Sequence, residues 1–451
     1  MVELRKLNVG EILQSIKTQN TLDAPLRIPD YQRAYCWREK NVLLLLDDVF
    51  DHTEHIYHLG TVILHFKDGR YDIIDGQQRL ITLSLLLQEL GETDVALLRE
   101  HLRSKEAMRY AAYNKYLIQN YISRRGWTSE EKKGQAEKLL SNLIMDVLIL
   151  SDGNLDLAYT FFSSQNTRGK ALTDYELLKS HHLRYIPIEK QQEHLAGKWD
   201  ALLMQSEQNT PEHRGDRSVS ITLGVYLFCL RKWTRKHEWY YKERNLVKNE
   251  FEAAPIIAEI PPFGEQFQYN EAIQGGTHFF AFVEQFVYRY RHFQETDQYK
   301  ILWQTISCSG MSKKTENNGI VDNRRRTHWW YGDVIATFLF AYYLKFGEEY
   351  LAEALTCITR IVSQSRYNTK RANRQTILRE ASNTEIILSI NQATSPTFFL
   401  AEMLAKIKML PMLTDEQKQN ILGDYKRWED RLYKQNQGYY LLSQFNNVPN
   451  R

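Results

Sequence analysis

The stretch GRYDIIDGQQRLITLSLLLQEL, from Gly69 to Leu90, changes from the pattern of a strand to the pattern of a helix. The segment YDII is rich in aromatic and β-branched residues, which is typical of a strand. From Leu80 to Leu90 leucine recurs with a period near 3.6, which indicates a helix. The preceding segment HLGTVILHF also fits a strand, and KDG fits a turn, so the two strands are predicted to form a hairpin. The junction DGQQR, residues 75–79, falls between strand and helix.

A strand-to-helix junction suits phosphate groups, because the first helical turn offers unpaired N–H donors and the positive end of the helix dipole. Gly76 would let the backbone approach a ligand closely, and Arg79 could bind phosphate oxygens with two donors. Gln77 and Gln78 could donate to phosphate, sugar or base groups. Asp75 could hold Mg²⁺ through water or orient an attacking water. Taken alone, these residues fit more simply an Asp-Gly turn with a solvated arginine.

A second group of polar and aromatic side chains lies in RIPDYQRAYCW, residues 27–37. The proline disfavours a helix, so the segment is predicted to be extended. Alternation then puts Tyr31, Arg33 and Tyr35 on one face and Gln32 on the other. Arg33 would lie at a site beside aromatic rings, although a plain strand with core aromatics and a surface arginine also fits.

The composition excludes several classes of protein. The net charge is only +3, so any affinity for nucleic acid requires local patches. The four cysteines are scattered, which suits neither a disulfide framework nor a zinc site. The N-terminus lacks a signal-peptide core, and no apolar run reaches the roughly 20 residues of a membrane span. We expect a soluble, cytoplasmic protein without a metal-ligand cluster and without a membrane partner.

The rest of the chain has a helical pattern, and residues 95–205 are expected to contain helices only. Within them, Thr173 and Glu176 have the spacing of a capping box that starts a helix. A polar run near residues 205–220 indicates a boundary. The predicted fold class is α+β. The predicted parts are a small mixed domain at 1–95, a helical extension at 96–210 and a mainly helical region of unknown role at 211–451.

Four segments in order, IPDYQRAYCW, HLGTVIL, YDIIDGQQRLITL and FFSSQNTRGKALTDYELLKSHHL, closely resemble the N-terminal domain of GmrSD-type restriction enzymes. The resemblance spans about residues 8–185 and implies a ParB/sulfiredoxin-like fold. It also implies binding and hydrolysis of a nucleoside triphosphate with Mg²⁺ at the DGQQR motif, in proteins that act against modified phage DNA. No Walker-type loop, dinucleotide glycine pattern or kinase signature competes with this interpretation.

The resemblance also implies roles for individual residues. Asp75 and Arg79 are the expected catalytic residues, with Asp75 orienting metal or water and Arg79 compensating phosphate charge. The expected nucleotide-binding residues are Tyr31, Gln32, Arg33, Gly76, Gln77 and Gln78. The second family motif contains Asn166, Arg168, Gly169 and Lys179. For Arg168, a structural role at the end of a helix fits equally well.

Family members with full restriction activity carry a second nuclease domain of the HNH type, which no segment after residue 220 resembles. His237, His278, His292 and His328 are isolated in the sequence, without the accompanying HxxP segment or asparagine-rich helix. We therefore expect a separate HNH-type nuclease subunit to supply DNA cleavage. A stand-alone member of the family whose C-terminal half has another role also fits.

Three basic and aromatic stretches after residue 230 could contact DNA by neutralising phosphates and stacking bases. They are RKWTRKHEWYYKER at 231–244, NRRRTHWWYGD at 323–333 and TRIVSQSRYNTKRANRQTILRE at 359–380. The third is the best candidate, through Arg366, Lys370, Arg371 and Arg374. Solvated helix faces above a tryptophan-rich core explain the same pattern.

Two other functions compete with nucleotide hydrolysis. One is a DNA-binding or DNA-nicking protein that uses the same pocket on the DNA backbone. The other is a protein-interaction subunit that keeps the pocket as a relic, although the intact motifs argue against it.

Overall fold

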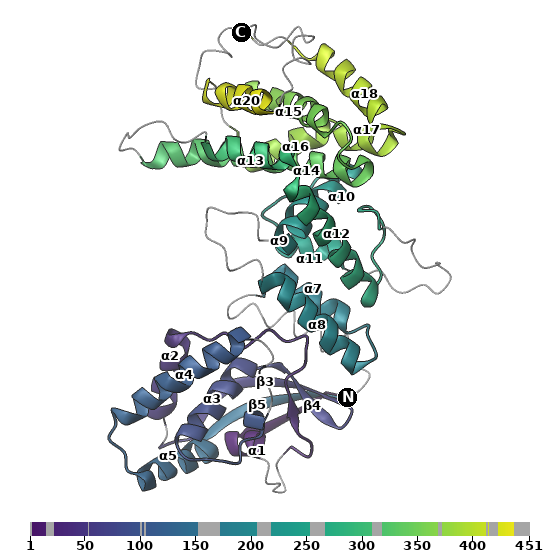
Figure 1. Ribbon diagram of the computed structural model, residues 1–451. Helices are drawn as coiled ribbons and strands as arrows, with labels where there is room; N and C mark the ends of the chain where they lie inside the picture. Colours follow the sequence, from purple (N-terminus) through teal and green to yellow (C-terminus); the bar gives the residue numbers. More distant parts are fainter. Residues whose placement is uncertain are drawn as a thin grey trace. The chain divides into compact units, whose positions relative to one another are not determined.

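The computed structural model describes residues 2–14, 22–52, 54–99, 102, 105–151, 172–204, 218–252, 267–308, 318–368, 372–411, 414 and 423–436. Contacts divide the chain into two compact units, Met1–Asp200 and Ala201–Arg451. The first unit contains a sheet covered by helices, and the second is helical (Figure 1). The predicted α+β class is therefore confirmed.

The first unit is built on a five-stranded sheet with the order β1-β5-β3-β4-β2. The strands are β1 (Val2–Asn8), β2 (Leu26–Arg27), β3 (Tyr57–Lys67), β4 (Arg70–Asp75) and β5 (Leu143–Leu150). The β1–β5 and β3–β4 pairs are antiparallel, whereas β3–β5 and β2–β4 are parallel. The predicted β3–β4 hairpin is confirmed. Asp68 and Gly69 form its turn with positive φ angles of 50° and 72°, as a tight hairpin turn requires.

Strand β5 lies between β1 and β3, which corrects the expectation that residues 95–205 contain helices only. Its sequence, LIMDVLIL, is apolar except for Asp146, and periodicity alone cannot distinguish such a run from a buried helix. A domain boundary at residue 95 would separate β5 from the sheet that it completes. The boundary expected at residue 210 lies outside the described residues.

Alternate residues of the strands face two hydrophobic clusters on opposite sides of the sheet. Val62, Leu64 and Ile73 belong to the larger cluster, together with residues of the covering helices. These helices are α1 (Val9–Leu13), α2 (Glu39–Asp51), α3 (Gln77–Glu89), α4 (Lys105–Ser123) and α5 (Ser129–Asn142), with a short turn η1 (Ala96–Arg99). Ile63 and Ile74 belong to the smaller cluster.

Helix α7 (Asp174–Leu183) reaches the smaller cluster through Leu177, and Tyr31 packs against the same cluster. The predicted capping box of Thr173 and Glu176 at the start of α7 is confirmed. Parts of the segment IPDYQRAYCW and of the segment that contains TDYELLKSHHL therefore meet on one face of the sheet. Helix α8 (Glu189–Met204) follows α7.

In the second unit, several helices contact the long helix α14 (Asn318–Phe346). The others are α9 (Ser218–Ile221), the π-helical turn η3 (Thr222–Leu227), α10 (Phe228–Thr234), α11 (Leu246–Phe251), α12 (Thr277–Glu295), α13 (Asp297–Cys308), α15 (Leu351–Tyr367), α16 (Arg374–Asn383), α17 (Ile386–Gln392), α18 (Pro396–Met409) and α20 (Gly423–Gln435). Aromatic rings fill much of the core, for example around Phe340, which contacts Tyr226, Tyr290 and Phe293. Across the described ranges, no helix has both the length and the apolar character needed to span a membrane.

Candidate functional site

The DGQQR motif lies at a strand-to-helix junction, as predicted: β4 ends at Asp75 and α3 begins at Gln77. Gly76 caps the helix with a φ of 94°, which other residues rarely adopt. A Cβ atom on Gly76 would also lie 2.9 Å from Cγ2 of Val62 on β3. Glycine is therefore required here by the backbone and by packing, before any ligand is considered.

Gln77 and Gln78 are buried, and they hold the segment that follows Tyr31 and Gln32 of the YQR motif. Gln77 Nε2 donates to the carbonyl of Arg33 at 3.2 Å. Gln78 Oε1 accepts from the N–H of Cys36 at 2.9 Å, and its Nε2 donates to the carbonyl of Ala34 at 3.3 Å. The structure thus brings the YQR and DGQQR motifs together at the start of α3.

A turn before Arg33 overturns the alternation predicted for residues 31–35. The N–H of Gln32 bonds the carbonyl of Pro29, and its side-chain Nε2 donates to the carbonyls of Ile73 and Ile74 at 2.9 and 2.6 Å. Because of this turn, Tyr31 and Tyr35 pack on opposite faces of the sheet, so the prediction of a shared face was wrong.

Arg79 braces an irregular part of β3. Its Nη1 donates to the carbonyl of Leu59 at 2.5 Å and its Nη2 to the carbonyl of Thr61 at 2.6 Å. Between them, Gly60 has a φ of 94°, and the register of β3 with β5 shifts. Burial lowers the pKa of Arg79, and the nearby charge of Asp75 opposes this effect. Arg79 is therefore not a solvated arginine that follows a plain turn. If it also binds phosphate, it does so in addition to holding the irregular part of β3.

Two groups at the junction are suited to a ligand. Asp75 is half-buried and close enough to Arg79 for their charges to interact. The Oε1 of Gln77 is buried, and no donor reaches it from the residues that the structure describes. A buried acceptor without a donor costs about 1–3 kcal/mol. This oxygen is therefore suited to accept a hydrogen bond from a bound molecule.

The Asp75 carboxylate lies beside the N-terminus of α3. A single carboxylate at such a place is suited to a Mg²⁺ ion whose other ligands are water and phosphate oxygens. No group of three or more His, Cys, Asp or Glu side chains is placed to hold a metal ion within the described part of the chain. The residues at the junction thus fit a metal that arrives with a nucleotide, rather than an all-protein metal site.

The second family motif is only partly described. Asn166, Arg168 and Gly169 lie outside the described residues. Lys179 lies on α7, is 6% exposed and donates to both carboxylate oxygens of Asp200 on α8 at 2.9 Å. Its observed role is to tie these two helices together.

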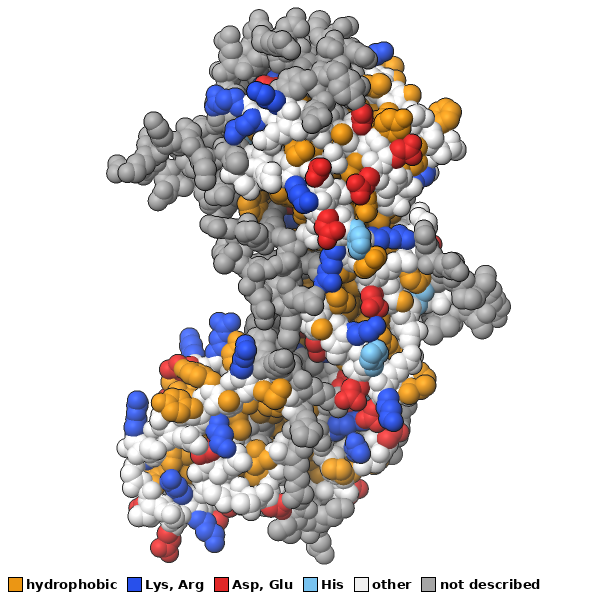
Figure 2. Space-filling view, in the orientation of Figure 1, with side chains coloured by type: hydrophobic (Ala, Val, Ile, Leu, Met, Phe, Trp, Pro, Cys, Tyr) orange, Lys and Arg blue, Asp and Glu red, His pale blue; other side chains and the backbone are white. Residues whose placement is uncertain are grey.

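Much of the charge in the first basic stretch is compensated inside the second unit. Arg231, Lys232 and Arg235 all pair with Glu250, at 2.7, 2.9 and 2.9 Å. Figure 2 shows basic and acidic side chains interspersed over much of one face. Ion pairs within the second unit therefore explain the basic residues of stretch 231–244 better than contact with DNA does.

The third basic stretch is described in part. Arg374 lies over the ring of Tyr241, with 5.4 Å between the guanidinium carbon and the ring centroid. Arg366 is half-buried near the end of α15. Lys370 and Arg371 lie outside the described residues, so DNA contact through these four residues stays a prediction.

The sheet and its junction define a small α+β domain in which polar motifs gather at the start of a buried helix. Residues 9–183 match the family model of the GmrSD restriction endonuclease N-terminal domain. The resemblance is thereby confirmed for this region. Residues 255–420 match a family of unknown function, DUF7834. A comparison with curated proteins finds no match to the chain.

Proposed function

We propose that the first unit binds and hydrolyses a nucleoside triphosphate at the junction of β4 and α3, as a component of a restriction-type system directed against phage DNA. The observation that carries the proposal is the junction itself. It combines the positive end of a buried helix with Asp75 and the buried acceptor of Gln77. The match of residues 9–183 to a restriction endonuclease domain supports the assignment to a defence system.

Each residue has a specific task in this proposal. The start of α3 and the charge of Arg79 attract the phosphate oxygens. Asp75 orients the attacking water or holds Mg²⁺ through its water ligands, and the metal compensates phosphate charge. Gln77 Oε1 accepts from a ribose hydroxyl or a base amino group. The bonds from Gln77 and Gln78 to residues 33–36 keep Arg33 beside this site.

Cleavage of DNA is assigned in this proposal to a separate nuclease subunit. The histidines after residue 220 are isolated in the sequence and do not form the HNH pattern. Nucleotide turnover would then control a partner rather than a nuclease centre within these residues. Co-purification with an HNH-type protein would test this part.

The direct test is a panel of nucleoside triphosphates incubated with the full chain and Mg²⁺, with and without DNA. Asp75→Asn should reduce turnover by about 100-fold or more, because it removes a group that orients water. Asp146→Asn is a matched control, since that carboxylate lies on the same sheet but pairs at the surface with His58. Its turnover should equal that of the unmodified chain.

Two results would contradict the proposal. The first is the absence of binding for every triphosphate in calorimetry. The second is full turnover by the Asp75→Asn variant with an unchanged melting temperature.

A further inference from the structure

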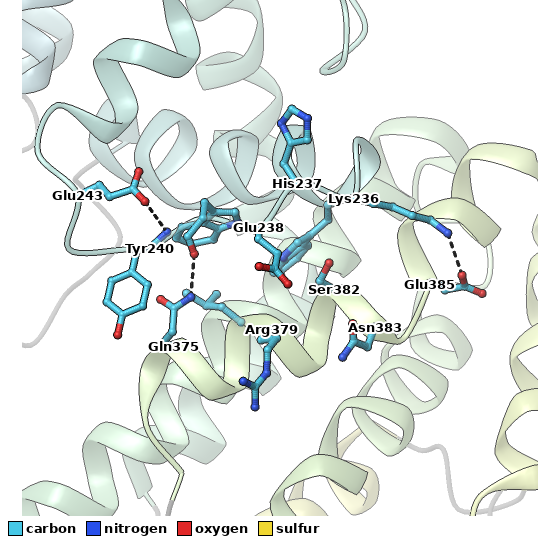
Figure 3. A pocket seen from close by; sticks show the side chains of 13 residues that line it. Lys236, His237, Glu238, Tyr240, Glu243, Gln375, Arg379, Ser382, Asn383 and Glu385 are labelled. Atoms are coloured by element: carbon cyan, nitrogen blue, oxygen red, sulfur yellow. Dashed lines mark hydrogen bonds and ion pairs between the residues drawn. The ribbon is translucent and has the colours of Figure 1, made fainter.

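The second unit contains a groove of about 600 Å³, which we call the α16 groove (Figure 3). One wall is the segment Lys236–Glu243, which follows α10, and the other is α16 with Glu385 beyond it. Small-molecule and cofactor sites in proteins have volumes of about 300–1,000 Å³. The α16 groove is thus large enough to receive a ligand, and none of the family motifs in the first unit contributes to it.

The aromatic wall of the groove is held in place by α16. Gln375 Nε2 donates to the carbonyl of Trp239 at 2.7 Å, and its Oε1 accepts from the N–H of Tyr241 at 3.2 Å. The Trp239 ring meets Phe228 edge-on, with 4.8 Å between the centroids. Tyr240, between these anchors, is 57% exposed. The Trp239 ring is therefore held in place before a ligand binds, which lowers the entropy lost on binding.

The charges of the lining favour a cation over a polyanion. Three carboxylates, of Glu238, Glu243 and Glu385, face two cations, of Lys236 and Arg379. Lys236 pairs with Glu385 at 3.2 Å, and Arg379 pairs with Glu380 of its own helix at 3.6 Å. Glu238 forms no ion pair with any residue that the structure describes, and it lines the groove together with Ser382 (Figure 3). The carboxylates that line the groove therefore outnumber the cations that line it by one.

We propose that the α16 groove binds a basic peptide segment of a partner protein. An arginine or lysine of that segment lies against Trp239 and pairs with Glu238. Aromatic faces attract cations, and a carboxylate accepts charge-assisted hydrogen bonds from guanidinium or ammonium groups. Ser382 and Asn383 line the same groove and offer hydrogen bonds to the peptide backbone. This inference is independent of the nucleotide site.

The test is calorimetric titration of the full chain with a blocked pentapeptide, acetyl-Gly-Arg-Gly-Arg-Gly-amide. A second peptide, with glutamine in place of arginine, has the same length and no charge. The arginine peptide should bind and the glutamine peptide should not. Glu238→Gln and Trp239→Leu should each weaken binding by about fivefold or more. Glu348→Gln changes an exposed carboxylate after α14 and should leave binding unchanged.

The proposal is overturned if the unmodified chain binds neither peptide, or if Glu238→Gln binds the arginine peptide as tightly as the unmodified chain. It is also overturned if a single-stranded oligonucleotide displaces the peptide and Trp239→Leu abolishes oligonucleotide binding. Circular dichroism checks the fold of each variant. If Trp239→Leu unfolds, the near-isosteric Glu238→Gln variant decides the outcome.

Discussion

Gly76 is constrained both by its backbone and by its neighbours, and these two constraints can be measured separately. Its φ of 94° strains any residue with a Cβ atom, and Val62 leaves no room for that atom. Gly76→Ala should lower the free energy of unfolding by about 2–4 kcal/mol, from strain and overpacking together. Urea denaturation of the full chain, followed by circular dichroism, measures the change.

Gly69 provides the matched control for Gly76→Ala. It also has a positive φ, 72°, but no atom lies within 4 Å of a Cβ placed there. Gly69→Ala should therefore cost only about 1–2 kcal/mol, from strain alone. Equal losses for the two variants would show that contact with Val62 does not matter.

At the scale of single residues, the sequence predicts which side chains lie near one another but not which groups they form hydrogen bonds with. Gln77, Gln78 and Arg79 were expected to face a nucleotide, yet each bonds main-chain groups of neighbouring segments. Hydrogen-bond partners in a folded protein are mostly backbone groups, and sequence spacing does not reveal those that lie far apart in the chain. What remains for a ligand, Asp75 and one oxygen of Gln77, emerges only from the three-dimensional structure.

Among the elements, those with strong local signals were predictable. The β3–β4 hairpin follows from its Asp-Gly turn, α3 from its leucine period, and the start of α7 from Thr173 and Glu176. β1 and β5 were missed. β5 is apolar except for Asp146, and β1 has a charged, largely exposed edge sequence, VELRKLN, so neither shows an alternation that runs through the whole strand. Their place in the sheet is set by pairing across more than 130 residues, which local patterns do not encode.

Helices α10 and α11 are joined by one buried carboxylate that receives three cations. The side chain of Glu250 is 2% exposed and contacts Arg231, Lys232 and Arg235. Glu250→Gln should lower the free energy of unfolding by about 3–5 kcal/mol, because it leaves partly buried cations without their counter-charge. Glu385→Gln, which breaks an exposed pair with Lys236, should cost about 1 kcal/mol or less. Urea denaturation at neutral pH compares the two variants.

The same carboxylate predicts a pH dependence. Burial alone would raise the pKa of Glu250, but hydrogen bonds and charges from Lys232 and Arg231 outweigh this effect and lower it. Its stabilisation is therefore fully present above the ordinary glutamate pKa of about 4.3 and is lost as the pH falls through the lowered pKa. The stability difference between the unmodified chain and Glu250→Gln should shrink below pH 4. A constant difference from pH 7 to pH 3 would contradict this assignment.

At the scale of the whole molecule, the first unit is longer than the motif-bearing segment that the sequence indicates. The hydrophobic cluster under α3 includes Ile118 of α4, Leu139 of α5 and Val147 of β5. All three follow residue 95, where the sequence places the end of the nucleotide-binding domain. Ending the domain at residue 95 would remove α4, α5 and β5. The apolar face of the sheet would then be exposed, and β3 would lack its parallel partner β5.

Residues 1–204, which keep α8 intact, should therefore fold as an independent domain, whereas residues 1–95 should not. The longer fragment should show a cooperative urea transition and dispersed amide signals in NMR spectra. The shorter one lacks a central strand and two covering helices, so it should unfold without a cooperative transition. If the proposed nucleotide site is complete in the first unit, residues 1–204 should also bind a triphosphate as tightly as the full chain. A folded 1–95 fragment would show that β5 is an accessory strand, and weaker binding by 1–204 would contradict a site that is complete in the first unit.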